Sequence, residues 1–279
     1  MSPRAVRLRS PAGTALILSL SACLLACAPL SVSDEQDLGD KFEREVRREY
    51  RFLNDDVVTA YITKIGNDVL RTLGPQPFEY RFFVVENKEI NAFAAPAGHI
   101  YVHTGTILAV RNVSELAGVI AHEIGHVTKR HIAQNYEAQH AASIGKQAAV
   151  IGAGILGGNV AAGAANLATG AGLSAVLNSF GRDAEREADD FAVQAMPAAG
   201  YDPNGLPSFF ETLVVEGGGR TPGFLSSHPA PEERLEATRK AISAQDFPPG
   251  LKVDDNGRLE IIQRRIELLT EGSKALRRR

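Results

Sequence analysis

The sequence is poor in cysteine, with only two among its 279 residues, and both of these, Cys23 and Cys27, lie close to the N-terminus. We therefore expect no disulfide within the folded part of the chain and no metal site built on cysteine ligands. An excess of basic residues is also missing, because the formal net charge is −3. Proteins that bind nucleic acid need such an excess to neutralise phosphates, so we expect no nucleic-acid partner.

A sustained run of large apolar residues is absent as well. The strongest candidate for a membrane segment, residues 139–179, is dominated by Ala and Gly and has Lys146 as its only formally charged residue. A membrane-inserted helical hairpin is one interpretation, because small residues let helices pack closely in lipid. The many glycines and the lack of a continuous Leu, Ile and Phe run argue against a membrane span. They favour a pair of soluble helices or a mobile lid that lies against the core, and contact with the membrane surface is a further alternative.

The first 27 residues have the pattern of a bacterial lipoprotein signal peptide. Three arginines precede an apolar stretch that is too short to cross a bilayer comfortably. The segments LSAC and LLAC, which end at Cys23 and Cys27, both resemble the lipobox, where cleavage leaves a lipid-modified cysteine at the new N-terminus. A plain signal peptide or an uncleaved anchor is the alternative. Since neither cysteine is followed by aspartate, the resemblance favours a periplasmic location with a lipid anchor in the outer membrane.

The remaining chain has the composition of a globular protein, with 44% apolar and 23% charged residues. Hydrophobic periodicity predicts an α+β fold that is mostly helical and has a small β-sheet. Residues 28–40 are polar and are expected to form a linker. Apolar side chains at helical spacing predict helix within 41–73, ended by a Gly-Pro pair. Further helices are expected at 181–200 and 231–242, and residues 246–279 form a tail with a candidate helix.

The strand signals lie ahead of the central motif. Residues 78–86 predict one strand, and residues 91–105 predict two short extended segments on either side of Pro96. Because proline cannot donate to a sheet ladder, the first of these segments is expected at a sheet edge. An unpaired edge can accept an extended peptide as an added strand.

Two histidines four residues apart dominate the chemistry of the sequence. His122 and His126 belong to the segment GVIAHEIGHVTKRH (118–131), which predicts a helix with Ser114 as its N-cap. Residues i and i+4 share one helix face, so both rings can reach a single zinc ion. Glu123 points about 100° away around the helix, where it can reach a water held by the ion and act as a general base. A catalytic zinc needs a third protein ligand.

A carboxylate pair downstream can supply that ligand. Glu185 and Asp189 are four residues apart in DAEREADDFA (183–192), on another predicted helix. One carboxylate can bind the metal while the other accepts the outer N–H of a ligating histidine and fixes its orientation. The alternative for this helix is an ordinary solvated acidic face.

Three segments together resemble the M48 peptidases in their order and separation, namely ELAGVIAHEIGHVTKRH (115–131), GRDAEREADDFA (181–192) and SSHPAPEERL (226–235). The resemblance covers 38–242 and implies a zincin-like metallopeptidase domain of the gluzincin type over 41–245, with one Zn²⁺ per chain. It points to the bacterial periplasmic lipoprotein branch without transmembrane helices or tetratricopeptide repeats. Two departures are His99 and Gly181, which stand where glycine and serine are more usual.

The resemblance implies a role for each residue of the site. His122, His126 and Glu185 would bind zinc, Glu123 would be the general base, and Asp189 would orient a histidine. His228 matches a histidine that in some relatives approaches the metal on a mobile loop, and it could instead be an inactive loop residue. Arg182 matches an arginine near the site that could bind a substrate carbonyl or hold Asp189.

The other histidines rank lower as candidate ligands. His131 follows the motif by five residues, which on a continuous helix would turn it away from the ligand pair, so it is expected to be structural. His99, His103 and His140 have no spacing that supports metal binding.

The sequence therefore predicts a zinc-dependent endopeptidase that cleaves misfolded or unassembled envelope proteins and is tied to the membrane by its lipid anchor. The alternative is a periplasmic factor that helps to assemble outer-membrane proteins and whose protease activity is latent or gated. A purely structural zinc site is disfavoured, because Glu123 stands beside the metal and no cysteine ligands are present.

Overall fold

The computed structural model describes residues 29–139, 141–142, 180–216, 223–229 and 231–277. The predicted signal peptide (1–27), most of the Gly/Ala-rich insert (139–179) and His140 lie outside the described residues. The helices are α2 (Val32–Glu49), α3 (Asp56–Leu70), α4 (Thr104–Ala109), α5 (Val113–Thr128), α8 (Arg182–Ala198), α9 (Gly205–Glu216), α10 (Gly223–Ser227), α11 (Pro231–Ser243) and α12 (Arg258–Arg277). The strands are β1 (Arg81–Val85), β2 (Ala92–Ala95) and β3 (His99–His103). The expected α+β, mostly helical fold with a small sheet is confirmed.

The three strands form one sheet in the order β1-β3-β2. β1 runs parallel to β3, whereas β2 runs antiparallel to it with Phe93 opposite Tyr101. A single turn of 3-10 helix, Pro96–Gly98, joins β2 to β3. Ala97 and Gly98 both have positive φ in this turn, which reverses the chain within three residues. The expectation that the segment before Pro96 lies at a sheet edge is confirmed.

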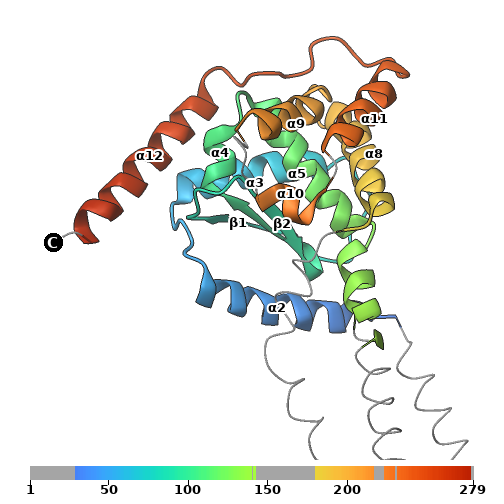
Figure 1. Ribbon diagram of the computed structural model, residues 1–279, viewed down its shortest axis with the longest axis horizontal. Helices are drawn as coiled ribbons and strands as arrows, with labels where there is room; N and C mark the ends of the chain where they lie inside the picture. Colours follow the sequence, from blue (N-terminus) through green and yellow to red (C-terminus); the bar gives the residue numbers. More distant parts are fainter. Residues whose placement is uncertain (1–28, 140, 143–179, 217–222, 230, 278–279) are drawn as a thin grey trace, which may run out of the picture.

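Helices cover both faces of the sheet (Figure 1). On one face, Tyr101 stacks between Phe83 and Phe93 at ring-centroid distances of 4.9 and 4.8 Å. Phe42 of α2 packs against this aromatic row, 6.2 Å from the ring of Tyr101. The opposite face presents β-branched side chains such as Val84 to α3 and α5. The alternation of large side chains along each strand therefore gives both faces of the sheet a helical partner.

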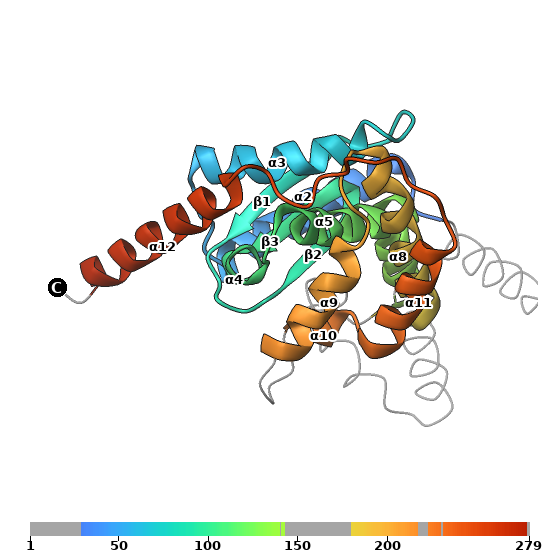
Figure 2. The same ribbon diagram turned by 90° about the horizontal axis from the view of Figure 1, so that it is seen from above.

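The central helix α5 is enclosed by the sheet, α3, α8 and α9 (Figure 2). Every residue of α5 before its last is buried. Two glycines allow this close packing, because a Cβ on Gly118 would come within 3.0 Å of the backbone of Leu206 and one on Gly125 within 3.2 Å of the backbone of Ala188. The motif helix is thus fixed on all sides, which holds its side chains in one geometry.

The start of α5 differs from the sequence-based expectation. Asn112 is the N-cap, and its side chain accepts a hydrogen bond from the backbone N–H of Glu115. The expected cap, Ser114, lies inside the helix and donates its hydroxyl to the carbonyl of Asp202. Asparagine and serine cap about equally well, so local preference did not distinguish between them.

The N-terminal region also differs. The expected linker at 28–40 is mostly helix, because α2 begins at Val32, where Ser31 caps it by accepting from the N–H of Asp34. The helix buries Phe42 and Val46 against the sheet, so its polar first half continues an amphipathic helix. The apolar run 41–73 is divided between two helices, since Asp55 caps the start of α3 by accepting from Val58.

The C-terminal helix α12 was expected and projects from the body of the protein (Figure 1). Its first half is attached through the buried side chains of Leu259, Ile262 and Ile266. Gln263 adds hydrogen bonds to the carbonyls of Ile107 and Val110. Within the described ranges, no helix combines the length and apolar content that crossing a bilayer requires.

Candidate metal centre

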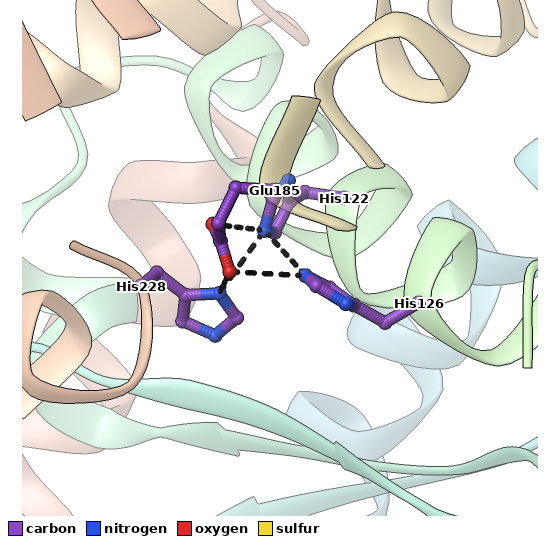
Figure 3. A group of neighbouring side chains, drawn as sticks. All are labelled: His122, His126, Glu185 and His228. Atoms are coloured by element: carbon purple, nitrogen blue, oxygen red, sulfur yellow. Dashed lines mark hydrogen bonds and ion pairs between the residues drawn. The ribbon is translucent and has the colours of Figure 1, made fainter. Parts of the chain in front are cut away.

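Two buried imidazoles on α5 form the base of the site. His122 and His126 are fully buried, and their Nε2 atoms lie 3.0 Å apart. The residues are one helical turn apart, so both rings leave the same face of α5, as the spacing predicted. Figure 3 shows both rings directed at a common space.

Glu185 reaches the same space from α8. Its Oε2 atom lies 3.5 Å from His122 Nε2, and its Oε1 atom lies 3.6 Å from His126 Nε2. The side chain is only 2% exposed. The close packing of α8 on α5 at Gly125 brings this carboxylate to two rings that are about sixty residues away in the sequence.

His228 is the fourth member of the group (Figure 3). It follows the short helix α10, and its Nδ1 atom lies 2.9 Å from Glu185 Oε1 and 3.2 Å from His122 Nε2. Its ring is fully buried and stacks on Phe224, with centroids 4.4 Å apart. In this conformation the loop histidine therefore lies among the candidate ligands.

The spacing of these donor atoms suits a tetrahedral metal ion. An ion held at about 2.0–2.1 Å by each donor separates tetrahedral donors by roughly 3.4 Å. Five of the six pairs among the four groups approach within 2.9 to 3.6 Å, and all four donor atoms lie within 4.8 Å of one another. Three nitrogens and one carboxylate oxygen form the type of donor set that zinc prefers. The residues present therefore fit a zinc ion.

Asp189 orients His122 from behind. Its Oδ1 atom lies 2.9 Å from His122 Nδ1 and accepts the hydrogen bond of this nitrogen, so Nε2 is the atom that is left to bind a metal ion. Burial by itself would lower the pKa of His122, but hydrogen bonds to Asp189 and Glu185 raise it to about 9. A metal ion that binds here must displace the proton from His122.

Arg234 on α11 is a residue that the sequence reasoning missed. It donates from Nε and Nη2 to the two oxygens of Asp189 at 2.8 and 2.6 Å, and its Nη1 lies 2.7 Å from Glu185 Oε2. Burial would raise the pKa of Asp189, yet this guanidinium holds it below its usual value. The residue stands in the segment SSHPAPEERL, six positions after His228, and only packing of α11 against α8 shows its role.

Glu123 lies on the other side of the cluster. It is fully buried, and within the described residues neither carboxylate oxygen has a hydrogen-bond partner. Its Oε1 atom lies 3.4 Å from His228 Nε2. Burial raises the pKa of this carboxyl above its ordinary value. A carboxylate without hydrogen bonds beside a metal cluster can accept a proton from a nearby water.

The comparison with known families agrees with this arrangement. The model of peptidase family M48 matches residues 57–242, roughly two thirds of the chain. The chain belongs to peptidase family M48. The matched range includes α5, α8, α10 and most of α11, so it contains the whole group of buried donors. Members of this family are metallopeptidases, which agrees with a buried cluster that can hold a metal ion.

Named relatives of this M48 chain are also proteases. The beta-barrel assembly-enhancing proteases of Escherichia coli (strain K12) and Yersinia pestis are each 34% identical to it, over 223 and 239 residues. These matches cover 77% and 82% of this chain but only 45% and 48% of the relatives, so the chain spans about half their length. Metalloprotease LoiP of Escherichia coli is 31% identical over 183 residues, which are 66% of this chain and 70% of LoiP.

Arg182 lies at the edge of the M48 site. Its side chain is 80% exposed and pairs with Glu233 at 3.5 Å. The residue that holds Asp189 is Arg234, so the expectation that Arg182 does so is wrong. Arg182 is the first residue of α8, one turn before Glu185. Both residues line a cavity of about 350 Å³ between α8 and α11.

The placement of His131 is a second correction. It was expected to face away from the ligand pair, but its Nδ1 atom lies 3.0 Å from Nδ1 of His126. The expectation assumed a continuous helix, whereas α5 ends at Thr128 and Arg130 adopts a left-handed conformation with φ 60°. This break returns the chain so that His131 lies behind His126.

His99 belongs to a separate cluster with Asp40 and Glu43, whose donor atoms are also close together. The guanidinium of Arg81 already lies among them, with Nη1 2.8 Å from Glu43 Oε2 and 3.2 Å from His99 Nε2. This cluster is therefore a salt bridge at the sheet face. His103 is buried beside Phe93, away from the donor group.

Proposed function

We propose that this chain is a zinc-dependent endopeptidase that hydrolyses misfolded or unassembled proteins of the bacterial envelope. The observation that carries the proposal is the convergence of His122, His126 and Glu185, with Glu123 beside them and Asp189 behind them. Three protein ligands, a free carboxylate and an orienting carboxylate are the parts that a catalytic zinc site requires.

The residues divide the work of peptide hydrolysis between them. A bound zinc ion supplies Lewis acidity toward the scissile carbonyl and lowers the pKa of water toward about 7. Glu123 takes the proton of the attacking water and delivers it to the leaving amine. Its burial raises its pKa, which makes it a stronger base and suits it to carry this proton between the two steps. Arg182, at the mouth of the cavity beside Glu185, can bind a substrate carbonyl.

The edge strand β2 is the proposed binding surface for the peptide. Its outer edge has no strand partner, because β2 pairs only with β3 within the described sheet. An extended peptide can add there through main-chain hydrogen bonds, which select for unfolded segments rather than for a sequence. In this conformation, α10 lies against β2, and the N–H of Phe224 is bonded to the carbonyl of Ile90. Substrate binding therefore requires α10 to move.

The envelope location rests on the signal-peptide pattern and on the relatives. The N-terminal pattern with Cys23 and Cys27 favours a lipid-anchored periplasmic protein at the outer membrane. The names of two relatives describe proteases that enhance β-barrel assembly. Unassembled β-barrel proteins expose unpaired strands in the periplasm, and such strands suit binding at a sheet edge.

A second candidate function is a gated or latent protease that acts chiefly in the assembly of outer-membrane proteins. The observation that favours it is the position of His228, which fills the fourth place around the donor group and contacts Glu123 at 3.4 Å. A catalytic zinc needs one open coordination position. With His228 in this place, the site is closed to substrate until the loop withdraws.

Metal analysis of the purified protein tests the proposal. We expect one zinc ion per chain in the wild type and a large loss of bound zinc in Glu185→Ala, because the third ligand is removed. The matched control is Asp183→Ala on the same helix α8, whose carboxylate is 85% exposed and lies outside the donor group. Wild-type zinc content in Glu185→Ala would show that this carboxylate is not a ligand.

A further inference from the structure

A chain of three side chains leads from the surface of α8 to the donor group. Glu187 is 56% exposed, and its Oε2 atom lies 3.4 Å from His131 Nε2. On the other side of the same ring, Nδ1 lies 3.0 Å from Nδ1 of His126. His126 in turn directs Nε2 at the donor group, 3.0 Å from Nε2 of His122. His126 is thus held between His131 and the donors.

The carboxylate at the end of this chain determines where each proton lies. A carboxylate only accepts hydrogen bonds, so His131 carries its proton on Nε2, toward Glu187. A neutral imidazole has a single N–H, so Nδ1 of His131 is an acceptor. The proton between the two Nδ1 atoms therefore belongs to His126. This tautomer leaves Nε2 of His126 with its lone pair directed at the donor group, as metal binding requires.

We propose that His131, held by Glu187, is a positioning residue that fixes the orientation and tautomer of His126 for metal binding. The inference rests on the zinc site of the proposed function and adds a residue to it. The two histidines on α5 are then oriented by different means, since Asp189 contacts His122 directly, whereas Glu187 acts on His126 through a second ring. Such outer partners typically change metal affinity by about 10–100-fold.

Contacts around His131 hold the turn that places this residue behind His126. Arg130 adopts a left-handed conformation, which is unfavourable for a residue other than glycine. Two hydrogen bonds at 2.9 Å, to the carbonyl of Leu30 and to Glu35, hold the Arg130 side chain in place. Phe180 stacks on His126 with centroids 4.0 Å apart, so the ring has little freedom to turn. The turn that places His131 is therefore maintained by contacts with α2.

Zinc affinity and imidazole tautomers together test the inference. Affinity is measured by competition with a chromogenic chelator for the wild type, His131→Leu and His131→Asn. Leucine offers no acceptor, so we expect zinc binding to weaken about 10–100-fold. The asparagine side chain places its oxygen near the position of Nδ1 and is expected to recover most of this loss. The matched control is Asp183→Asn, which alters an 85% exposed carboxylate on α8, the helix that carries Glu187, and should leave zinc affinity unchanged.

The tautomers are read from long-range ¹H–¹⁵N correlation spectra of the zinc-loaded wild type. We expect an Nε2–H ring for His131 and an Nδ1–H ring for His126. The inference is overturned if His131 carries its proton on Nδ1, or if His131→Leu binds zinc as tightly as the wild type. Should His131→Leu fail to fold, the zinc affinity of His131→Asn and the tautomers in the wild-type spectrum still test the role of His131. A wild type that binds no zinc would remove the proposed metal centre itself, whereas equal affinities remove only the role of His131.

Discussion

Arg234 holds Asp189 through two parallel hydrogen bonds, from Nε at 2.8 Å and from Nη2 at 2.6 Å. The pair is buried and stands directly behind His122, which lies 2.9 Å from Asp189. The third nitrogen of Arg234 faces Glu185 at 2.7 Å. One guanidinium thus contacts both the candidate ligand on α8 and the carboxylate that orients a candidate ligand on α5.

We expect Arg234→Lys to fold but to bind zinc about 10–100-fold more weakly. Lysine keeps the positive charge, yet it cannot form the two parallel hydrogen bonds that hold Asp189 in place. Arg234→Met should be more severe, because it leaves two buried carboxylates without their partner, at a cost of roughly 3–5 kcal/mol in unfolding free energy. Chelator competition and urea unfolding measure the two effects. Unchanged zinc affinity in the lysine variant would show that the two parallel hydrogen bonds from Arg234 to Asp189 are not needed for metal binding.

Replacing Glu123 with glutamine should keep the metal and remove the activity. The amide cannot accept the proton of the attacking water, so we expect casein cleavage to fall by about 10²–10⁴-fold. Zinc content should stay at the wild-type level, because Glu123 is not among the converging donors. Cleavage at the wild-type rate, in a variant that retains zinc, would show that another group is the base.

Replacing His228 with alanine tests whether the loop histidine closes the site. The ring lies within 3.2 Å of His122 and 2.9 Å of Glu185, so its removal opens the fourth position. If the open state of the wild type is populated below one part in ten, casein cleavage should rise by about ten-fold or more. Ser226→Ala, an exposed change on α10, is the control. A fall in activity would indicate that His228 assists the reaction instead of closing the site.

His103 makes stability sensitive to mild acid. Burial lowers the pKa of His103 from its ordinary value of 6.5 to about 4. Between these two pH values the unfolded chain binds a proton at this position and the folded protein does not, so stability falls as the pH drops from 6.5 to 4. At 1.36 kcal/mol per pH unit, the loss amounts to roughly 3 kcal/mol.

The variant His103→Leu has no imidazole that could bind a proton in the unfolded chain, so it should lose less stability in acid. We expect its unfolding free energy, measured in urea at pH 7 and pH 4.5, to fall by about 2–3 kcal/mol less than that of the wild type over the same interval. Equal losses in the two proteins would mean that His103 already titrates normally in the folded state.

Local patterns predicted the elements that carry the site. The i, i+4 spacing placed His122 and His126 on one face of a helix, and the structure brings their Nε2 atoms to 3.0 Å. The proline after β2 indicated an edge strand, because a missing N–H is a local property that needs no knowledge of the fold. Both predictions used periodicity or covalent geometry, which neighbouring residues fix by themselves.

Local patterns were less informative where several residue types serve equally well. Asn112 and Ser114 are both good N-caps, and the side chain that closes the first turn is that of Asn112. A polar segment after residue 30 was expected to be a linker, yet α2 buries its apolar side against the sheet. In these places the choice depended on contacts with distant segments.

The sequence by itself determined the chemistry of this protein, because the residue types and their spacing along two helices specify which donors can meet a metal ion. Only the tertiary structure decided how those donors are held. Arg234 reaches Asp189 from 45 positions away, and His131 returns to His126 through a backbone turn that no periodicity reveals. Orientation arises from long-range packing of α8 and α9 on α5 and of α11 on α8 and α9, and such packing has no signature in neighbouring residues.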